Sequence, residues 1–398
     1  MTRHSGTIAP HQCRQTGPCN RLQIDAPATM ETFAPGMIGT HVAAGPHMRR
    51  RVTLKDVAEI VGVHVSTVSR ALDPKTRHLI TPEVAGAILK ASETLGYRQN
   101  AAAYSLKTNR TRTIGVVVPD ITNPIFPPMI RGVEDALAAH GYAAIIANTD
   151  SDMRREEDIS ETLRARGVDG LILASVERED EATARLSAEG LAIVTVNRKV
   201  NDPAVSSIVH DDDDGMRRVL VHLAALGHRK VAKIAGPQAL STGEDRYRAF
   251  QRHCAALGLD SVPGLIAFAQ NFNEMEGERC TEVLLAAGPR FTAIVCSNDR
   301  LAVGTVAALR RHDLACPGDI SVTGYNDMPM VDRLFPPLTT IRIQQYRAGF
   351  EAAELLYAAL QITPEQRRPR HVVLPVELIV RGSTQKLAAD ASLRAGRA

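Results

Sequence analysis

A glycine separates two short amphipathic patterns in residues 53–72. Before Gly62, apolar residues recur at three- and four-residue steps, the spacing of one buried helical face, and Thr53 can cap such a helix. The same steps resume between Val65 and Leu72. Two short helices about a glycine-containing turn predict a helix-turn-helix, whose second helix can lie in a DNA major groove. The apolar positions are Leu54, Val57, Ala58, Val61, Val65, Val68 and Leu72.

A third helix completes this small domain. Thr81, Pro82 and Glu83 provide a cap, a proline in the first turn and an early acid, and Gly96 ends the pattern. We therefore expect a DNA-binding domain over residues 48–96. The polar side of its second helix carries hydrogen-bonding groups suited to bases and phosphates, namely Ser66, Thr67, Ser69 and Arg70. The alternative is a helical hairpin that packs against another part of the protein.

Residues 97–112 are polar and basic, and we interpret them as a hinge. Within them, Ala101 to Leu106 favour a helix but are too few to hold one in water. They form either a linker or a segment that folds when docked.

From Thr113 onwards, short β-branched runs alternate with helical patterns. This alternation predicts a doubly wound α/β architecture, large enough for two lobes with a ligand crevice at the carboxyl ends of the strands. The expected strands are IGVVVP, AAIIAN, GLILAS, AIVTVN, KVAKIAG, AIVCSN, ISVTGY and HVVLPVELIVRG, and the expected helices are 127–139, 153–166, 179–189, 212–226, 244–257, 275–287, 299–312 and 345–360.

Charge is distributed unevenly along the 398 residues. Residues 48–112 hold 12 Lys and Arg against 5 Asp and Glu, whereas residues 113–398 hold 32 against 37. A basic module joined to a mildly acidic body indicates a nucleic-acid binder with a second function. Residues 1–47 lack periodicity, and we interpret them as a disordered extension or the product of a start codon placed too far upstream.

The six cysteines show no zinc or disulfide spacing, and no apolar run of 18 residues or signal peptide is present. These features predict a cytoplasmic protein that does not enter a membrane. The run from His210 to Gly215 resembles a calcium loop but lacks acids at the first and twelfth positions, so we expect no metal there and read it as a helix start. Nucleotide-binding and hydrolase motifs such as GxxxxGK[ST], HExxH and GxSxG are also lacking, so we expect neither an enzyme nor a cofactor.

Several of these motifs together resemble one family. TLKDVAEIVGVHVSTVSRAL, LGYRQNAAAYSL, TIGVVVPDITNPIF, HLAALGHRKVAKIAG, VCSNDRLAVG and PPLTTIRI are similar to segments of the lac-repressor (LacI/GalR) family of bacterial transcription regulators. The resemblance covers about residues 51–382. It implies a DNA-binding head, a hinge helix, and a core of two lobes like periplasmic sugar-binding proteins. Members act as dimers on pseudo-palindromic operators. We therefore expect a homodimeric repressor controlled by a small-molecule effector and located on the bacterial nucleoid.

The resemblance also implies lobe boundaries. The first lobe would comprise residues 113–210 with 343–370, the second 211–342 with 371–383, and a flexible tail would follow over 384–398. A solute-binding protein of a sugar transporter has the same kind of core and is the alternative, but it has no use for a basic helix-turn-helix.

Roles in DNA binding follow from the same resemblance. Val65, Ser66 and Arg70 match base-reading positions, and Leu106 matches the leucine that the family inserts into the operator's minor groove. His64 stands where the family usually has a capping serine, and histidine is a poorer helix cap. Phosphate-contacting or helix-positioning roles fall on Thr53, Thr67, Ser69 and Asn100.

The resemblance also implies an effector pocket in the core, and we expect its ligand to be a sugar or sugar derivative. Phe126 and Phe272 offer flat apolar faces, Arg246 offers a planar fork of donors, and the Asn and Asp side chains can bond to hydroxyls. Asn197 stands where many relatives carry Asp. The matching positions are Asp120, Asn123, Phe126, Asn197, Arg246, Phe272, Asn298 and Asn326.

Overall fold

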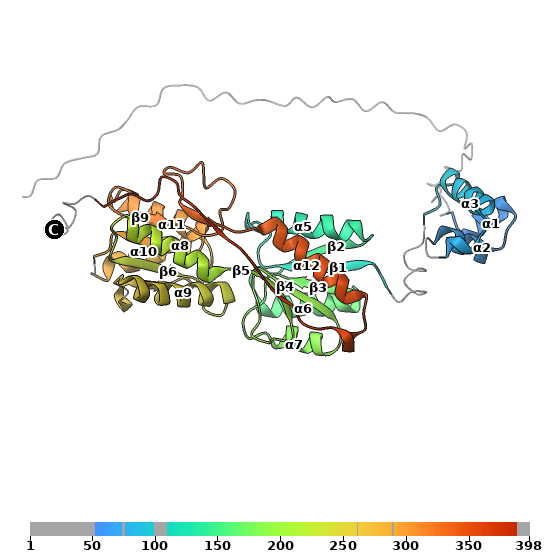
Figure 1. Ribbon diagram of the computed structural model, residues 1–398, viewed down its shortest axis with the longest axis horizontal. Coiled ribbons are helices and arrows are strands. Elements are labelled where there is room, and N and C mark those ends of the chain that lie inside the picture. The colour runs from blue at the N-terminus through green and yellow to red at the C-terminus, as the bar shows by residue number, and fades with distance from the viewer. Residues whose placement is uncertain (1–51, 74–75, 99–109, 261, 289, 388–398) are drawn as a thin grey trace, which may run out of the picture. The chain divides into compact units, whose positions relative to one another are not determined.

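The computed structural model describes residues 52–73, 76–98, 110–260, 262–288 and 290–387 (Figure 1). The chain divides into two compact units, residues 1–98 and 99–398, which we call the head and the core. The expected extension over residues 1–47, Asn100 and Leu106 lie outside the described residues.

The head is a bundle of three α-helices. They are α1 (Leu54–Val61), α2 (Val65–Leu72) and α3 (Pro82–Thr94), with a 3₁₀ turn at Arg77–Leu79. Thr53 caps α1 as expected, in a reciprocal arrangement in which the Asp56 carboxylate accepts from the Thr53 backbone N–H at 2.7 Å. Gly62 ends α1 with a φ of 72°, a conformation that glycine adopts without strain. The helices enclose a small core of Val57, Ala58, Val68, Ala71, Ala85 and Ile88.

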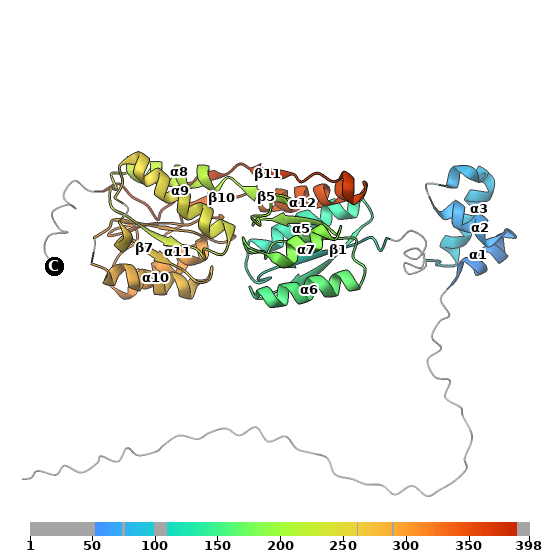
Figure 2. The same cartoon turned by 90° about the horizontal axis from the view of Figure 1, so that it is seen from below.

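The first lobe of the core is a six-stranded parallel sheet with helices on both faces (Figures 1 and 2). Helices α5 (Phe126–Ala139) and α12 (Gln345–Leu360) contribute to the apolar cluster on one side. Helices α6 (Met153–Ala165) and α7 (Glu181–Ala188) contribute to that on the other. In the order β11-β5-β4-β3-β1-β2, the strands are His371–Leu374, Ser206–His210, Ala192–Val196, Gly170–Leu173, Thr113–Val118 and Ala143–Asn148.

The second lobe repeats this plan with a four-stranded parallel sheet. Its strand order is β7 (Ile266–Phe268), β6 (Val231–Ala235), β8 (Ala293–Cys296) and β9 (Ser321–Thr323). Helices α8 (Asp212–Ala225) and α9 (Ser241–Leu257) pack into one apolar cluster. Helices α10 (Glu274–Ala286) and α11 (Asp299–Arg311) pack into the other. Asp212, Asp213 and Asp214 fall in the first turn of α8, which confirms the helix start expected there.

Three chain segments connect the lobes. The chain leaves the first lobe between β5 and α8, and returns between β10 (Thr340–Arg342) and α12. It leaves again between β11 and β12 (Glu377–Ile379), and β12 pairs with β10 in an antiparallel ribbon. The backbone N–H of Asp211 donates to the carbonyl oxygen of Leu374 at 2.9 Å, so two of these connections are bonded to each other.

Two expected boundaries were wrong. We assigned residues 371–383 to the second lobe, but β11 pairs with β5 and forms the edge of the first sheet. The local sequence of a strand does not say which sheet it joins. We also expected a flexible tail from residue 384, yet Leu387 N–H donates to Leu226 O at 3.0 Å and Gln385 N–H donates to Ser321 Oγ at 3.1 Å. Residues 384–387 therefore belong to the second lobe.

Candidate DNA-reading helix and interlobe pocket

Helix α2 presents one apolar and one polar side. Val68 and Ala71 are buried in the head's core, and Val65 packs partly against it. Ser66 and Arg70 are exposed, one turn apart, while Thr67 and Ser69 are half-buried. An exposed hydroxyl and an exposed guanidinium on one helix supply the donors and acceptors that base edges and phosphates require.

His64 caps α2 in place of the expected serine. Its Nδ1 accepts the backbone N–H of Ser66 at 3.2 Å and lies 2.7 Å from the Ser66 hydroxyl. One of the donors left free at a helix start is thereby satisfied, and the helix begins at Val65. The sequence predicts a weaker cap here, because histidine is a poorer helix cap than serine. The ring nitrogen Nδ1 of His64 nevertheless accepts the hydrogen bond that a serine oxygen would accept.

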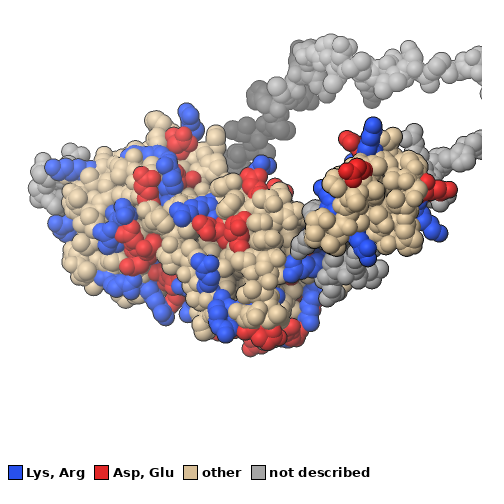
Figure 3. Space-filling model, turned by 45° about the vertical axis from the view of Figure 1, so that its right-hand side comes forward, with Lys and Arg blue, Asp and Glu red and all other residues tan. Residues whose placement is uncertain are grey.

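The helical part of the head is almost neutral. Residues 52–98 hold six Lys and Arg against five Asp and Glu. Figure 3 shows blue and red side chains interspersed on the face of the head that it displays. The positive excess of residues 48–112 comes from the segments on either side of the head's helices. These segments contain Arg49, Arg50 and Arg51 before the helices, and Lys107, Arg110 and Arg112 after them. Non-specific attraction to DNA therefore depends on the flanks of the head more than on its helices.

A pocket of about 330 Å³, partly open to solvent, lies between the two lobes. Side chains from both lobes form its walls, and small-molecule sites commonly lie at such boundaries. Seven of the eight expected effector residues line it: Asn123, Phe126, Asn197, Arg246, Phe272, Asn298 and Asn326. The carboxyl ends of parallel strands and the starts of the helices that follow them meet at this place.

Arg246 on α9 is held rigidly in the pocket wall. Its Nε donates to Asp212 Oδ1 at 2.9 Å and its Nη1 donates to Ser297 O at 2.7 Å. The guanidinium carbon lies 3.8 Å from the centre of the Tyr325 ring. These bonds occupy two of its five N–H groups, so Arg246 offers a ligand fewer donors than we expected, in a fixed orientation.

Asn197 and Asn326 combine backbone strain with buried amide oxygens. Their φ values are 66° and 114°, a region that residues other than glycine rarely adopt. Both side chains are more than nine-tenths buried, and neither Oδ1 accepts a hydrogen bond from a described residue. Strained backbone and unpaired polar atoms are both costly, and they concentrate at functional sites.

The structure does not place Asp120, the eighth expected residue, in the pocket wall. Its Oδ1 accepts from the backbone and hydroxyl of Thr122, and its Oδ2 accepts from Arg300 Nη1 at 3.1 Å. Arg300 on α11 is in turn bound by both carboxylate oxygens of Glu274, each at 2.8 Å. These hydrogen bonds and the positive charge of Arg300 lower the pKa of Asp120. Asp120 therefore joins the two lobes to each other.

Three pocket residues escaped the sequence analysis: Ile125, Arg198 and Thr242. Thr242 lies one helical turn before Arg246, so the four-residue spacing could have identified it. Arg198 follows Asn197 directly, and Ile125 precedes Phe126. We expected single residues at strand ends, whereas short consecutive segments form the wall.

No group of three His, Cys, Asp or Glu side chains within the described residues is arranged to hold a metal ion. Within the same part of the chain, no helix is long and apolar enough to cross a membrane.

A helix-turn-helix head joined to a two-lobed core with a pocket between the lobes defines a class, the ligand-responsive DNA-binding regulators of transcription. Comparison with known protein families supports this class for both the head and the core. Residues 53–100 match bacterial regulatory proteins of the lacI family, and residues 220–384 match a periplasmic binding protein-like domain. The match to the head excludes the transporter alternative, which has the core alone.

Relatives extend the match to nearly their full length. The HTH-type transcriptional regulator RegA of Clostridium saccharobutylicum is 31% identical over 83% of this chain and 99% of its own. The ribose operon repressor of Halalkalibacterium halodurans is 30% identical over 84% of this chain and 97% of its own. The chain belongs to the lacI family of transcription regulators.

Solved structures show the same arrangement. The lac repressor dimer bound to operator and the anti-inducer ONPF is 25% identical, covers 84% of this chain and all of its own, and has a TM-score of 0.74. The transcriptional regulator CelR in complex with cellobiose is 28% identical over the same shares, with a TM-score of 0.64.

Proposed function

We propose that this protein is a repressor that binds a pseudo-palindromic operator as a homodimer on the bacterial nucleoid. Helix α2 lies in the major groove, where Val65, Ser66 and Arg70 read base edges. Thr53, Thr67, Ser69 and Asn100 contact phosphates or position the helix, and Leu106 enters the central minor groove. The support is the exposed polar side of α2, fixed by the His64 cap, together with membership of the family.

We further propose that the interlobe pocket binds a sugar or another polyol as the effector, with Asp120 outside the contact set. The observation that carries this proposal is the pair of buried, unpaired amide oxygens on Asn197 and Asn326. Each requires a donor, and ligand hydroxyl groups are donors that also accept from Arg246. Phe126 and Phe272 provide the flat faces against which the C–H side of a sugar ring packs. CelR, which was solved with cellobiose, shares the fold.

A thermal-shift screen of the full chain against monosaccharides, disaccharides and nucleosides tests the ligand class. A ligand that binds only the folded protein raises its melting temperature. The ligand identified in this way is then titrated by calorimetry into Asn197→Gly. Glycine accepts the positive φ without strain and removes only the amide, so we expect an affinity loss of about tenfold, equivalent to about 1.4 kcal/mol.

The matched control is Asp313→Gly, at an exposed position with a φ of 55° outside the pocket. It should leave the ligand affinity unchanged. Stabilisation by nucleosides alone, or an affinity in Asn197→Gly equal to that of the wild type, would contradict the proposed polyol site.

A further inference from the structure

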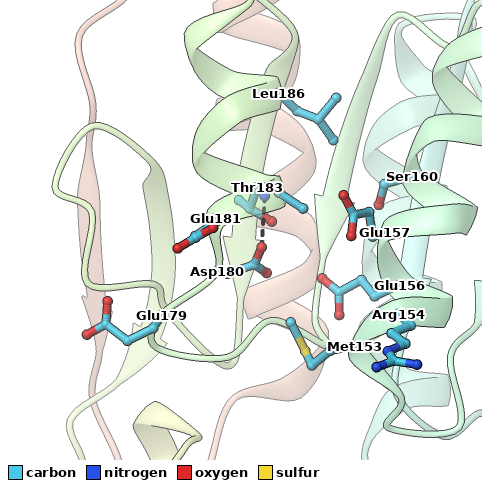
Figure 4. Close-up of a pocket in the computed structure, with 11 residues that line it drawn as sticks. Met153, Arg154, Glu156, Glu157, Ser160, Glu179, Asp180, Glu181, Thr183 and Leu186 are labelled. Atoms are coloured by element: carbon cyan, nitrogen blue, oxygen red, sulfur yellow. Dashed lines mark hydrogen bonds between the residues drawn. The ribbon is translucent and has the colours of Figure 1, made fainter.

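A second cavity lies in the first lobe, between the first turns of α6 and α7 (Figure 4). It offers about 650 Å³ of space, part of it open to solvent, and shares no lining residue with the interlobe pocket. Carboxylates dominate its polar lining, while Met153, Ala182 and Leu186 supply an apolar surface. The proposed effector site makes no use of this cavity.

Glu156 is the most unusual group in this cavity. The residue is 3% exposed, and neither of its carboxylate oxygens accepts a hydrogen bond from a described residue. A buried carboxylate without partners is strongly unfavourable. The usual compensation is a positive charge or a set of donors, and within the described part of the chain no ion pair is formed by Glu156.

Asp180 faces Glu156 from the other side of the cavity. Figure 4 shows the two carboxylates pointing toward one another across the gap between α6 and α7. Asp180 is 8% exposed; its Oδ1 accepts the backbone N–H of Thr183 at 2.8 Å and so caps α7, while its Oδ2 is unpaired among the described residues. Two buried acids therefore offer three unpaired oxygens to one space.

The remaining charged residues of the cavity add negative charge around its rim. Glu157, Glu179 and Glu181 also line it, and Arg154 is the single Lys or Arg among its described lining residues. Glu157 is bound to Arg185 at 3.1 Å and Glu179 to Asn201 at 2.6 Å, so both are already partnered. Glu181 is exposed to solvent, so Glu156 and Asp180 are the buried acids of this cavity with unpaired oxygens.

We propose that this cavity, hereafter the α6–α7 cavity, binds a small organic cation with primary ammonium groups, such as a short aliphatic diamine. An ammonium group brings three donors and a positive charge, which suits the three unpaired oxygens of Glu156 and Asp180. The methylene chain of a diamine would pack against Met153 and Ala182, which are partly exposed. A single metal ion fits less well, because the described acids are not grouped closely enough to coordinate one.

The protonation of Glu156 gives the proposal a second observable consequence. Burial raises the pKa of Glu156 to about 7; the nearby Ser175 hydroxyl and Arg198 act to lower it, and Asp180 and Glu177 act to raise it. Near pH 7 a large fraction of Glu156 is therefore protonated. A bound cation favours the charged carboxylate and lowers this pKa, so binding near pH 7 should release protons.

Calorimetric titration of the full chain with putrescine is the direct test. We expect one binding site per chain, with a heat that changes with the ionisation enthalpy of the buffer because protons are released. 1,4-Butanediol has the same carbon chain with hydroxyls in place of ammonium groups, and it should not bind. Equal binding of the diol, no binding of putrescine, or displacement of putrescine by an equal concentration of Mg²⁺ would overturn the proposal.

Two nearly isosteric variants locate the site. Glu156→Gln and Asp180→Asn each remove one charge, and Asn still caps a helix. Each should weaken putrescine binding by about tenfold, the loss expected for one charge-assisted contact. Asp158→Asn, on an exposed residue of α6 outside the cavity, is the matched control and should bind as the wild type does.

Asn197→Gly in the interlobe pocket should also retain putrescine binding, which separates this site from the effector site. Melting temperatures establish that each variant is folded. If both cavity variants are folded and bind putrescine as tightly as the wild type, the cation does not occupy the α6–α7 cavity.

Discussion

Lys233 is a cation enclosed in the apolar interior of the second lobe. It lies on β6 and is fully buried, with Nζ 3.8 Å from Met216 Sδ and 5.7 Å from the centre of the Phe250 ring. Burial lowers its pKa to about 7, from 10.5 for a free side chain. Cys254, Cys296, Asp212 and Arg246 also act on this pKa. The amine is more easily charged in the unfolded chain than in the folded one.

This difference predicts how stability depends on pH. Between about pH 7 and pH 10.5 the unfolded state binds more protons at this site, so the site's contribution to stability rises with pH. Below pH 7 both states are protonated and the cost of burying the charge is fully present. Lys233→Met, which keeps the length of the side chain, should raise the free energy of unfolding by about 4 kcal/mol at pH 7 and by little at pH 10.5.

Urea denaturation of Lys233→Met and wild type at pH 7 and pH 10 measures the effect as a difference, in which other titrating groups cancel. Lys230→Met, an exposed substitution just before β6, is the control and should show no such pH dependence. A constant difference between Lys233→Met and wild type across this range would mean that Lys233 stays charged in the folded protein.

The residues at the pocket could be predicted from the sequence, but the hydrogen bonds and ion pairs that they form could not. Asn197, Asn298 and Asn326 were assigned to the pocket by the resemblance to the family, and all three line it. Asp120 was misplaced because its partner Arg300 lies 180 positions away in the sequence. The bonds of Arg246 to Asp212 and Ser297 depend equally on long-range packing.

At the scale of elements, α2 permits a sharp prediction about DNA. Arg70 is exposed on the polar side of the helix, where a guanidinium can bond to two acceptors of a guanine. Arg70→Ala should weaken binding to the specific operator by about 1–3 kcal/mol and relax discrimination at one symmetric base position. Lys90→Ala, on the exposed side of α3, is the matched removal of charge.

Fluorescence anisotropy with operator and random duplexes at one salt concentration distinguishes the roles. Arg70→Ala should reduce the ratio of the two affinities, whereas Lys90→Ala should leave this ratio unchanged. An equal loss on both duplexes in Arg70→Ala would identify Arg70 as a phosphate contact.

Helices were easier to predict than strands because their pattern is longer. The start and end of each core helix fell within about three residues of expectation, and α12 was placed correctly at residues 345–360. β5 was missed because Ser206, Ser207 and His210 make it polar. β5 lies inside the sheet, between β4 and β11. Its polar side chains are accommodated there by partners on the next strand, such as His371, whose Nδ1 lies 3.0 Å from Ser207 Oγ. β7 and β10, with three residues each, are too short to produce a pattern.

For the whole molecule, the interlobe ion pair predicts an effect on ligand binding. Asp120→Asn keeps an acceptor for the Thr122 turn but loses the charge that faces Arg300. The pair is partly exposed, so its contribution should be at most about 1 kcal/mol. Because opening of the lobes becomes easier, effector affinity should fall by up to about fivefold. Calorimetric titration of Asp120→Asn with the effector measures this change, and Asp158→Asn serves as the control. Tighter effector binding in Asp120→Asn would show that the lobes do not close on the bound effector.

The charge distribution predicts how truncation changes DNA binding. A chain that starts at Met48 keeps Arg49, Arg50 and Arg51 and should bind operator as the full chain does. A chain that starts at Val52 should lose about five units of the slope of log affinity against log salt, since both chains of the dimer lose three arginines and each phosphate contact contributes about 0.9. Titrations at several salt concentrations measure both slopes. Equal slopes for the two truncations would show that these arginines do not contact phosphates.

The return of β11 to the edge of the first sheet has a consequence for synthesis on the ribosome. Neither core lobe is complete until residues near its C-terminal end have emerged, because β11 closes the first sheet and residues 384–387 bond to the second lobe. The head, whose core uses residues 52–97, is complete far earlier. At about 5–20 residues per second, the head precedes the completed core by roughly 15 to 60 s. During that interval a nascent chain can reach DNA near its own gene, with no effector able to regulate it.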